Sequence, residues 1–303
     1  MLKKCCELAS ALITTVFALG FCAGAGAATK EQCLAEPGFV WIGKGKAILG
    51  SDQRERDDAY RLTAEAIAAE GSNDVAGEER QLREAKWFDN EQSRREVAHG
   101  DICISGTLVT NAEYAAFVAA ARHRVPGITE ADYKAQGFLF HSYSEVVPFL
   151  WTGGTFPNGE GRYPVVLVSY DDARAFAAWK GKGRTVSFRL PTADEWEAGA
   201  RGGDGRMFPW GTAWRADVSN TAAAGLKHTS AVGAFPAGRS PYGLDDVGGN
   251  VFEYTHSDEA DPEFVEAKNC AWDDYPGFCR AAFRHSRTAA SRHILIGFRL
   301  VME

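Results

Sequence analysis

The sequence predicts an α+β fold with few helices, short strands and much irregular loop. Only a handful of segments carry a helical pattern with a capping residue at the start. The apolar, strand-like segments are short, and the stretches between them are rich in glycine and aromatic residues, with 32 glycines and 12% aromatics in 303 residues. Loops with this composition must pack onto the body of the protein or line a site.

The N-terminus has the pattern of a secretory signal peptide. Lys3 and Lys4 precede an apolar run over 8–21, and small residues follow up to Ala27. This order predicts a signal peptide over 1–27, cleavage near Ala27, and a mature chain of 28–303 that is periplasmic or secreted.

Two alternatives to cleavage are a membrane anchor and a lipid anchor. A membrane anchor is disfavoured because the apolar run is shorter than the roughly 20 residues that span a bilayer. A lipid anchor on Cys22 is disfavoured because the bulky Phe21 stands where a small residue is usual. The expected mature form therefore has no membrane span.

Charge and cysteine content narrow the function classes. The net charge is −7 and no stripe of lysine and arginine is present, which argues against a nucleic-acid partner. Three of the seven cysteines fall in the leader, and Cys33, Cys103, Cys270 and Cys279 remain. An even number in an oxidising compartment predicts two disulfides with three possible pairings, of which Cys33–Cys103 and Cys270–Cys279 is the simplest. A metal or redox site at these cysteines is the rival interpretation.

The first elements are a strand over 39–42, a glycine-rich turn, and a second strand ending before Gly50. A charged, alanine-rich segment over about 52–95 is expected to be a partly helical insertion, with a helix over 60–70 that Gly71 and its polar neighbours stop. It is either a partner-binding arm or a solvated excursion, and the second is favoured.

Three helices are predicted from their caps. Thr110 and Asn111 precede a helix over 112–121, Ser169 precedes a second one, and Thr192 with Glu195 forms a capping box for a third. Strands are expected over 163–168 and 294–301, and the aromatic-rich segment 122–162 between the first two helices is expected mainly to pack onto the core.

Five motifs in order resemble one family. They are 163–173 (YPVVLVSYDDA), 189–197 (RLPTADEWE), 208–211 (FPWG), 242–253 (YGLDDVGGNVFE) and 296–300 (IGFRL). Together they resemble the formylglycine-generating enzyme (sulfatase-modifying factor) superfamily over nearly all of the mature chain. The resemblance implies a single domain with a fold related to C-type lectins. It leaves function open, because the superfamily includes copper-dependent oxidases, iron-dependent sulfoxide synthases, a pyoverdine-maturation branch and binding proteins.

The resemblance argues against copper. Counting back from Arg280 places the family's two copper cysteines near Ala271 and Pro276, neither of which is a thiol. If the protein is an oxidase, Cys270 and Cys279 are its candidate catalytic residues, in a displaced site that His285 or His293 would complete. Monovalent copper needs two facing thiolates, so a shifted register disfavours it. The scattered histidines provide no triad for iron.

The resemblance also implies a calcium site in the glycine-rich loop. By residue matching it falls on the side chains of Asp246 and Glu253 and the carbonyls of Gly249 and Val251, hard oxygen ligands of the kind calcium prefers. A weaker second site would use Asn220 and Thr221, where the aspartate it also needs is replaced by Ala224.

Two functions are therefore expected from the sequence. The favoured one is a copper-free binding or accessory protein that acts on a periplasmic or secreted protein or peptide by chaperoning, neutralising or maturing it. The alternative is an oxidoreductase that oxidises a protein or peptide, by formylglycine formation or by chemistry like that of the pyoverdine branch.

Overall fold

The structure is a computed structural model that describes residues 28–137, 140–259 and 262–303. The predicted signal peptide, its cleavage point at Ala27 and the lipidation alternative at Cys22 lie outside the described residues. Within these ranges, every helix is too short or too polar to cross a bilayer.

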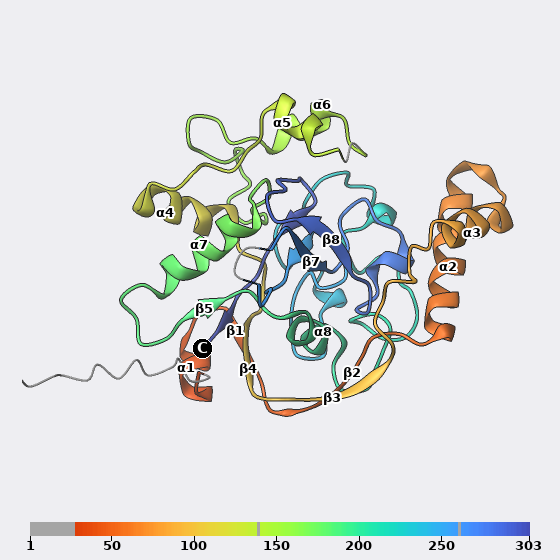
Figure 1. Ribbon diagram of the computed structural model, residues 1–303, viewed down its shortest axis with the longest axis horizontal. Helices are drawn as coiled ribbons and strands as arrows, with labels where there is room; N and C mark the ends of the chain where they lie inside the picture. Colours follow the sequence, from red (N-terminus) through yellow and green to blue (C-terminus); the bar gives the residue numbers. More distant parts are fainter. Residues whose placement is uncertain (1–27, 138–139, 260–261) are drawn as a thin grey trace, which may run out of the picture.

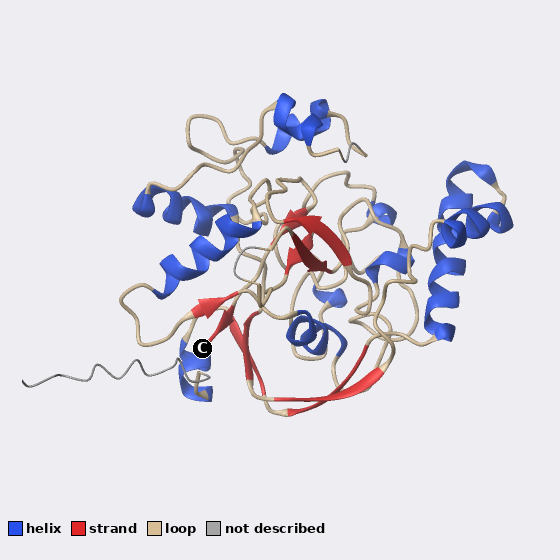
Figure 2. Cartoon of the chain, viewed as in Figure 1, coloured by secondary structure: helices blue, strands red, loops and turns tan. Residues whose placement is uncertain are grey.

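Most helices lie around the outside of short sheets, whereas α8 (Ala193–Arg201) lies between the sheets (Figures 1 and 2). The α-helices are α1 (Lys30–Ala35), α2 (Gln53–Ile67), α3 (Val75–Glu84), α4 (Asn111–Ala121), α5 (Glu130–Ala135), α6 (Tyr143–Val146), α7 (Tyr170–Gly181) and α8 (Ala193–Arg201). One π-helical turn is η1 (Ala68–Ser72). Short 3₁₀ helices are η2 (Val147–Phe149), η3 (Ala222–Ala224), η4 (Pro236–Gly238) and η5 (Pro276–Cys279).

The strands form three small sheets. They are β1 (Phe39–Ile42), β2 (Gly45–Leu49), β3 (Arg95–His99), β4 (Ile102–Ser105), β5 (Phe188–Arg189), β6 (Phe252–Tyr254), β7 (Phe264–Lys268), β8 (His285–Thr288), β9 (Ile296–Gly297) and β10 (Val301–Met302). Their orders are β1-β4-β10-β5, β2-β3 and β8-β7-β6-β9, and the pairs are antiparallel except for β6 with β9. Few helices, short strands and long loops confirm the predicted α+β class.

The predicted caps start the predicted helices. Thr110, Ser169 and Thr192 are the N-caps of α4, α7 and α8, and each belongs to a complete capping box. Helix α8 contacts β2 and β7 and buries Trp196 between them. Local signals therefore position the helices that frame the core.

Two predicted strands differ from the structure. Over 163–168 only Pro164 makes a strand bridge, because the amides of Val165 and Leu167 donate to carbonyls of two different segments instead of one partner strand. The C-terminal strand is divided into β9 and β10, and between them the buried side chain of Arg299 pairs with Glu253.

The charged segment forms a helical arm, which we define as α2, η1 and α3 (53–84) and which projects from one side of the body in Figure 1. Helix α2, capped by Asp52, begins seven residues before the predicted helix start, and α3 is a helix that the sequence did not predict. The inner face of α2 is buried, and the hydroxyl of Thr63 accepts a 2.9 Å hydrogen bond from the amide of Gly277. The arm is thus fixed to η5, which differs from the expected solvated excursion.

Both disulfides follow the simplest pairing. Cys33 in α1 is bonded to Cys103 in β4, and Cys270 after β7 is bonded to Cys279 in η5. All four sulfurs belong to buried residues.

Candidate functional site

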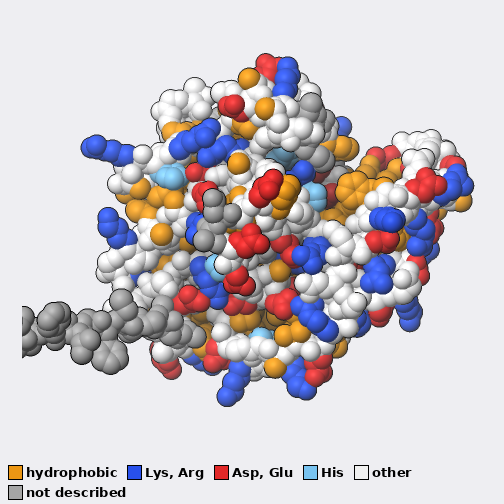
Figure 3. Space-filling view, in the orientation of Figure 1, with side chains coloured by type: hydrophobic (Ala, Val, Ile, Leu, Met, Phe, Trp, Pro, Cys, Tyr) orange, Lys and Arg blue, Asp and Glu red, His pale blue; other side chains and the backbone are white. Residues whose placement is uncertain are grey.

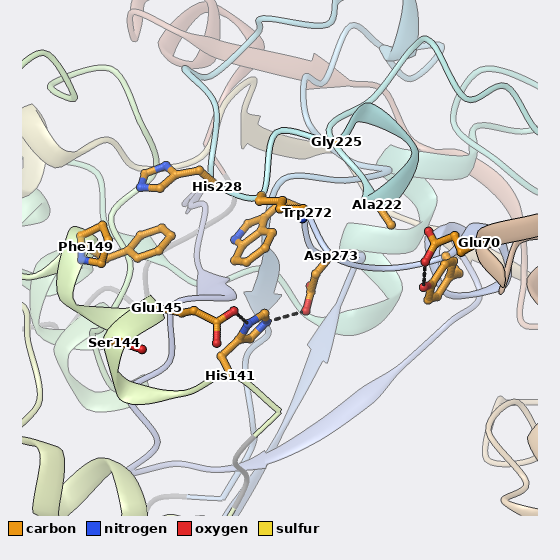
Figure 4. A pocket seen from close by; sticks show the side chains of 13 residues that line it. Glu70, His141, Ser144, Glu145, Phe149, Ala222, Gly225, His228, Trp272 and Asp273 are labelled. Carbon is orange, nitrogen blue, oxygen red and sulfur yellow. Dashed lines mark hydrogen bonds and ion pairs between the residues drawn. The ribbon is translucent and has the colours of Figure 1, made fainter.

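A cavity of about 540 Å³ opens between the α6–η2 segment, η3 and the loop after β7. Figure 4 shows its lining, which includes Glu70 from the helical arm. The residues that surround it are Glu70, His141, Ser144, Glu145, Pro148, Phe149, Ala222, Gly225, Lys227, His228, Trp272, Asp273 and Tyr275. Elements distant in sequence thus meet around one polar and aromatic space.

His141 lies between two carboxylates at this cavity (Figure 4). Its Nε2 is 2.8 Å from Asp273 Oδ2, and its Nδ1 is 3.2 Å from Glu145 Oε1. Burial favours the neutral ring, but the hydrogen bonds to Asp273 and Glu145 outweigh it and raise the pKa of His141 above its ordinary value. His141 therefore keeps its positive charge to a higher pH than a free histidine.

Trp272 lines the cavity and has a buried indole N–H. Its backbone amide donates to the carbonyl of Asn250 at 3.0 Å, and its ring centroid lies 5.0 Å from that of His141. The side chain is only 5% exposed, and its Nε1 has no hydrogen-bond partner in the part of the chain that the structure describes. The same holds for Asp273 Oδ1. Buried polar atoms are nearly always satisfied, so these two atoms are exceptions among the described residues.

A second, apolar cavity of about 290 Å³ shares Asp273 and Tyr275 with the first. It is walled by the arm on one side and by the segment around η5 on the other. Its apolar lining consists of Ile67, Leu82, Trp87, Phe140, Phe252, Phe278, Phe283 and Leu295. Figure 3 shows hydrophobic side chains gathered where the arm meets the body. Trp87 and Phe140 are 40% and 72% exposed, respectively, so the apolar surface continues to solvent.

Burial shifts the pKa of three further groups near the cavities toward the neutral form. Burial, assisted by Arg287, lowers the pKa of His285 and of His293 to about 3. Burial and the neighbouring Asp273 raise the pKa of Asp274 well above its usual range. The site thus offers one imidazole whose charged form is stabilised by two carboxylates, with neutral histidines behind it. This arrangement can bind polar ligands and can exchange a proton at His141.

The candidate copper residues do not form a thiolate site. Cys270 and Cys279 are joined to each other, and the family positions Ala271 and Pro276 hold no thiol. Across the described ranges, no three His, Cys, Asp or Glu side chains are placed to hold one metal ion. His285 and His293 therefore do not complete a copper site with these cysteines as the structure stands.

The four residues matched to the calcium loop are engaged within the protein. Glu253 forms a two-pronged pair with Arg299, at 2.6 and 2.9 Å, and both residues are fully buried. Asp246 Oδ2 accepts a hydrogen bond from the amide of Gly233 at 2.8 Å. The carbonyls of Gly249 and Val251 each accept a hydrogen bond from the side-chain amide of Asn269. In this arrangement the four residues do not fit a calcium ion.

The residues of the weaker second calcium site are engaged differently. Asn220 and Thr221 are buried, and Asn220 Oδ1 and Thr221 Oγ1 have no partner among the described residues. These oxygens fit the donor type that calcium prefers, but both are neutral, and the position of the missing aspartate is indeed an alanine, Ala224. Calcium at Asn220 and Thr221 stays a prediction.

The sequence did not single out His141, Glu145 or Asp273. His141 and Glu145 belong to the aromatic-rich segment 122–162, for which lining a site was the less favoured role. Asp273 follows Trp272 directly, and 132 positions separate Asp273 from His141. The useful signal was the density of aromatic residues in a loop, which marks surface that must be covered.

Comparison with known proteins agrees with this fold. Residues 26–303 match the family model described as "Sulfatase-modifying factor enzyme 1-like domain". The chain is 33% identical to the inactive C-alpha-formylglycine-generating enzyme 2 of Bos taurus over 61% of this chain and 70% of that protein. It is 34% identical to the formylglycine-generating enzyme of Thermomonospora curvata over 55% of this chain and 63% of the enzyme.

Among solved structures, PvdO from Pseudomonas aeruginosa is similar, with a TM-score of 0.63 and 23% identity over 88% of this chain and 94% of PvdO. This last likeness concerns the fold. The match of the family model extends over nearly the whole chain and includes the predicted motifs. The chain therefore belongs to the sulfatase-modifying factor, or formylglycine-generating-enzyme-like, family.

Proposed function

We propose that this protein is an exported, copper-free accessory factor that binds a segment of a periplasmic or secreted protein in the cleft formed by the two cavities. The observation that carries the proposal is a polar cavity beside an apolar one, with Trp272 and Asp273 in its lining, each of which has a buried polar atom without a partner among the described residues. Two disulfides support work in an oxidising compartment.

The lining indicates the chemistry of the segment. A peptide carbonyl is a suitable acceptor for the indole N–H of Trp272, because it would satisfy a donor that is otherwise buried without a partner. An apolar side chain of the peptide would fill the apolar cavity that Trp87 and Phe278 help to line. A neighbouring cationic side chain would face Asp273 and Glu70, which line the polar cavity.

The closed disulfide supports a role without copper. A disulfide cannot supply the thiolates that monovalent copper requires, and Ala271 and Pro276 replace the residues that the family uses. The bovine relative described as inactive is 33% identical to this chain, close to the 34% of the Thermomonospora curvata enzyme. Loss of formylglycine formation is therefore compatible with the fold.

A second candidate is an oxidoreductase acting on a bound peptide. His141 and its carboxylate neighbours favour it, because a histidine held by Asp273 can accept and return a proton. The hypothesis needs an oxidising group in addition to this pair, and the closed cysteines do not supply the thiolates for copper.

Binding of two defined peptides tests the proposal. Both are acetylated hexapeptides of alanine with a central phenylalanine, followed by arginine in one and by glutamate in the other. We expect the arginine peptide to bind about tenfold more tightly, because a charge-assisted hydrogen bond contributes about 1.5–3 kcal/mol. Trp272→Phe, which removes the N–H and keeps an aromatic ring, should weaken binding of this peptide. Isothermal titration calorimetry measures both effects.

Trp214→Phe is the matched control, because Trp214 packs on Phe208 and Trp210 and lines neither cavity. This variant should bind like the wild type. Equal affinities for the two peptides, or a Trp272→Phe variant as tight as the Trp214→Phe variant, would contradict the proposed binding mode.

A further inference from the structure

Three backbone carbonyls of the glycine-rich loop converge on one side chain. The Nδ2 of Asn269 lies 2.7 Å from the carbonyl oxygen of Asp246 and 2.9 Å from those of Gly249 and Val251. Asn269 is 1% exposed. A set of convergent carbonyl oxygens is the kind of cage that holds a cation in many loops, but here a neutral amide group lies at its centre.

The orientation of this amide is fixed by a fourth contact. The amide of Gly249 donates to Asn269 Oδ1 at 3.0 Å, so the oxygen faces the donor and the nitrogen faces the carbonyls. The opposite orientation would bring an oxygen against three oxygens. Asn269 also has a φ of 78°, in the left-handed region that asparagine tolerates better than most residues.

We infer that the side-chain amide of Asn269 takes the place of a cation in the 246–251 loop and makes this loop independent of calcium. The two N–H hydrogens of the amide are shared among the three carbonyl oxygens, which a cation would otherwise coordinate. The calcium that the family resemblance implies at Asp246 and Glu253 is thereby replaced by a residue of this chain.

This replacement has a consequence for the cleft. The carbonyl of Asn250, inside the same loop, accepts the backbone amide of Trp272. The loop that positions the indole is therefore held by Asn269 and its cage, whatever the calcium concentration outside the cell. The inference concerns the loop and stands separately from the proposed peptide binding.

Asn269→Asp tests the inference by changing one atom type without changing shape. The variant places a carboxylate oxygen against three carbonyls, so its Tm in chelator should fall by roughly 5–10 °C from the loss of buried hydrogen bonds. Millimolar calcium should recover most of that loss, because a carboxylate with three carbonyls is a cation site. Differential scanning calorimetry in EDTA and in calcium measures the calcium-induced rise in Tm for the variant and the wild type.

Asn73→Asp is the matched control, since Asn73 is also left-handed, at a φ of 53°, but is exposed on the arm. The expected result is a larger calcium-induced rise in Asn269→Asp than in the wild type and the control. Any calcium bound at Asn220 and Thr221 contributes equally to all three proteins. Equal rises in all three proteins would overturn the inference. If Asn269→Asp does not fold, Asn269→Gly replaces it, because glycine suits the backbone and also opens the cage, and the same comparison decides.

Discussion

Replacing Arg280 by methionine is expected to lower the free energy of unfolding by about 3–5 kcal/mol, because it leaves buried carboxylates without their partner. Arg280 is fully buried and forms a two-pronged pair with Glu91. Its Nη1 also lies 3.4 Å from Glu55 of α2, and its Nε donates to the carbonyl of Gly277 at 3.0 Å. One side chain therefore joins η5 to α2 and to the segment that follows the arm.

One of these two carboxylates, that of Glu55, also contacts other arginines. Glu55 accepts from Arg201 of α8 at 2.8 Å and from Arg94 at 3.1 Å. Loss of Arg280 should therefore also loosen the arm, which carries Glu70 to the polar cavity. Because the remaining arginines share the charge of Glu55, the larger part of the cost falls on Glu91.

Urea unfolding of Arg280→Met and of Lys46→Met measures this effect. Lys46 also pairs with a glutamate, Glu96, but both side chains are well exposed, so its loss should leave the free energy of unfolding almost unchanged. The double variant Arg280→Met and Glu91→Met should recover part of the loss, because it removes the uncompensated charge. An Arg280→Met variant no less stable than Lys46→Met would show that the buried network does not hold the arm.

Removing the disulfide between Cys33 and Cys103 is expected to lower the free energy of unfolding by about 4 kcal/mol. The two cysteines are 70 positions apart, and a cross-link over such a long loop restricts the unfolded chain strongly. Both side chains are buried where α1 packs against β1 and β4, so alanine at these positions also leaves unfilled space.

The comparison is between Cys33→Ala with Cys103→Ala and Cys270→Ala with Cys279→Ala, unfolded by urea without reductant. The second bond closes a loop of only 9 positions, so its removal should cost less, about 2–3 kcal/mol. Peptide mapping of the wild type under the same conditions confirms which bonds are present. A larger loss from the second pair than from the first would contradict the loop-length argument.

Sequence patterns predicted the parts of the fold that depend on neighbouring residues. The capping boxes at Thr110, Ser169 and Thr192 are complete within four residues, so each could be recognised without knowledge of the tertiary structure. The predicted strand over 163–168 failed for the opposite reason. Its apolar residues are buried, but their amides bond to segments that approach from different parts of the chain.

The arrangement of the candidate functional site depends almost entirely on contacts between residues that are distant in sequence. Neither His141 nor Asp273 stands out in sequence, and their hydrogen bond exists only because the α6 segment lies over the loop after β7. The calcium prediction rested on residues of the 246–253 segment alone. It could not include Asn269 or Arg299, which reach into that segment from β7 and from the C-terminal end. Residue matching gives the donors of a cage but not what occupies it.

The central claim is that this family member binds a peptide in the cleft without copper-dependent oxidation. The most direct test incubates the reduced, copper-loaded protein with a Cys-x-Pro-x-Arg sulfatase peptide under oxygen and follows the peptide by mass spectrometry. We expect a peptide of unchanged mass, with wild-type protein and with Cys270→Ser alike, because the family positions Ala271 and Pro276 hold no thiol even after reduction. Conversion of the peptide cysteine to formylglycine by the wild type, lost in Cys270→Ser, would contradict it.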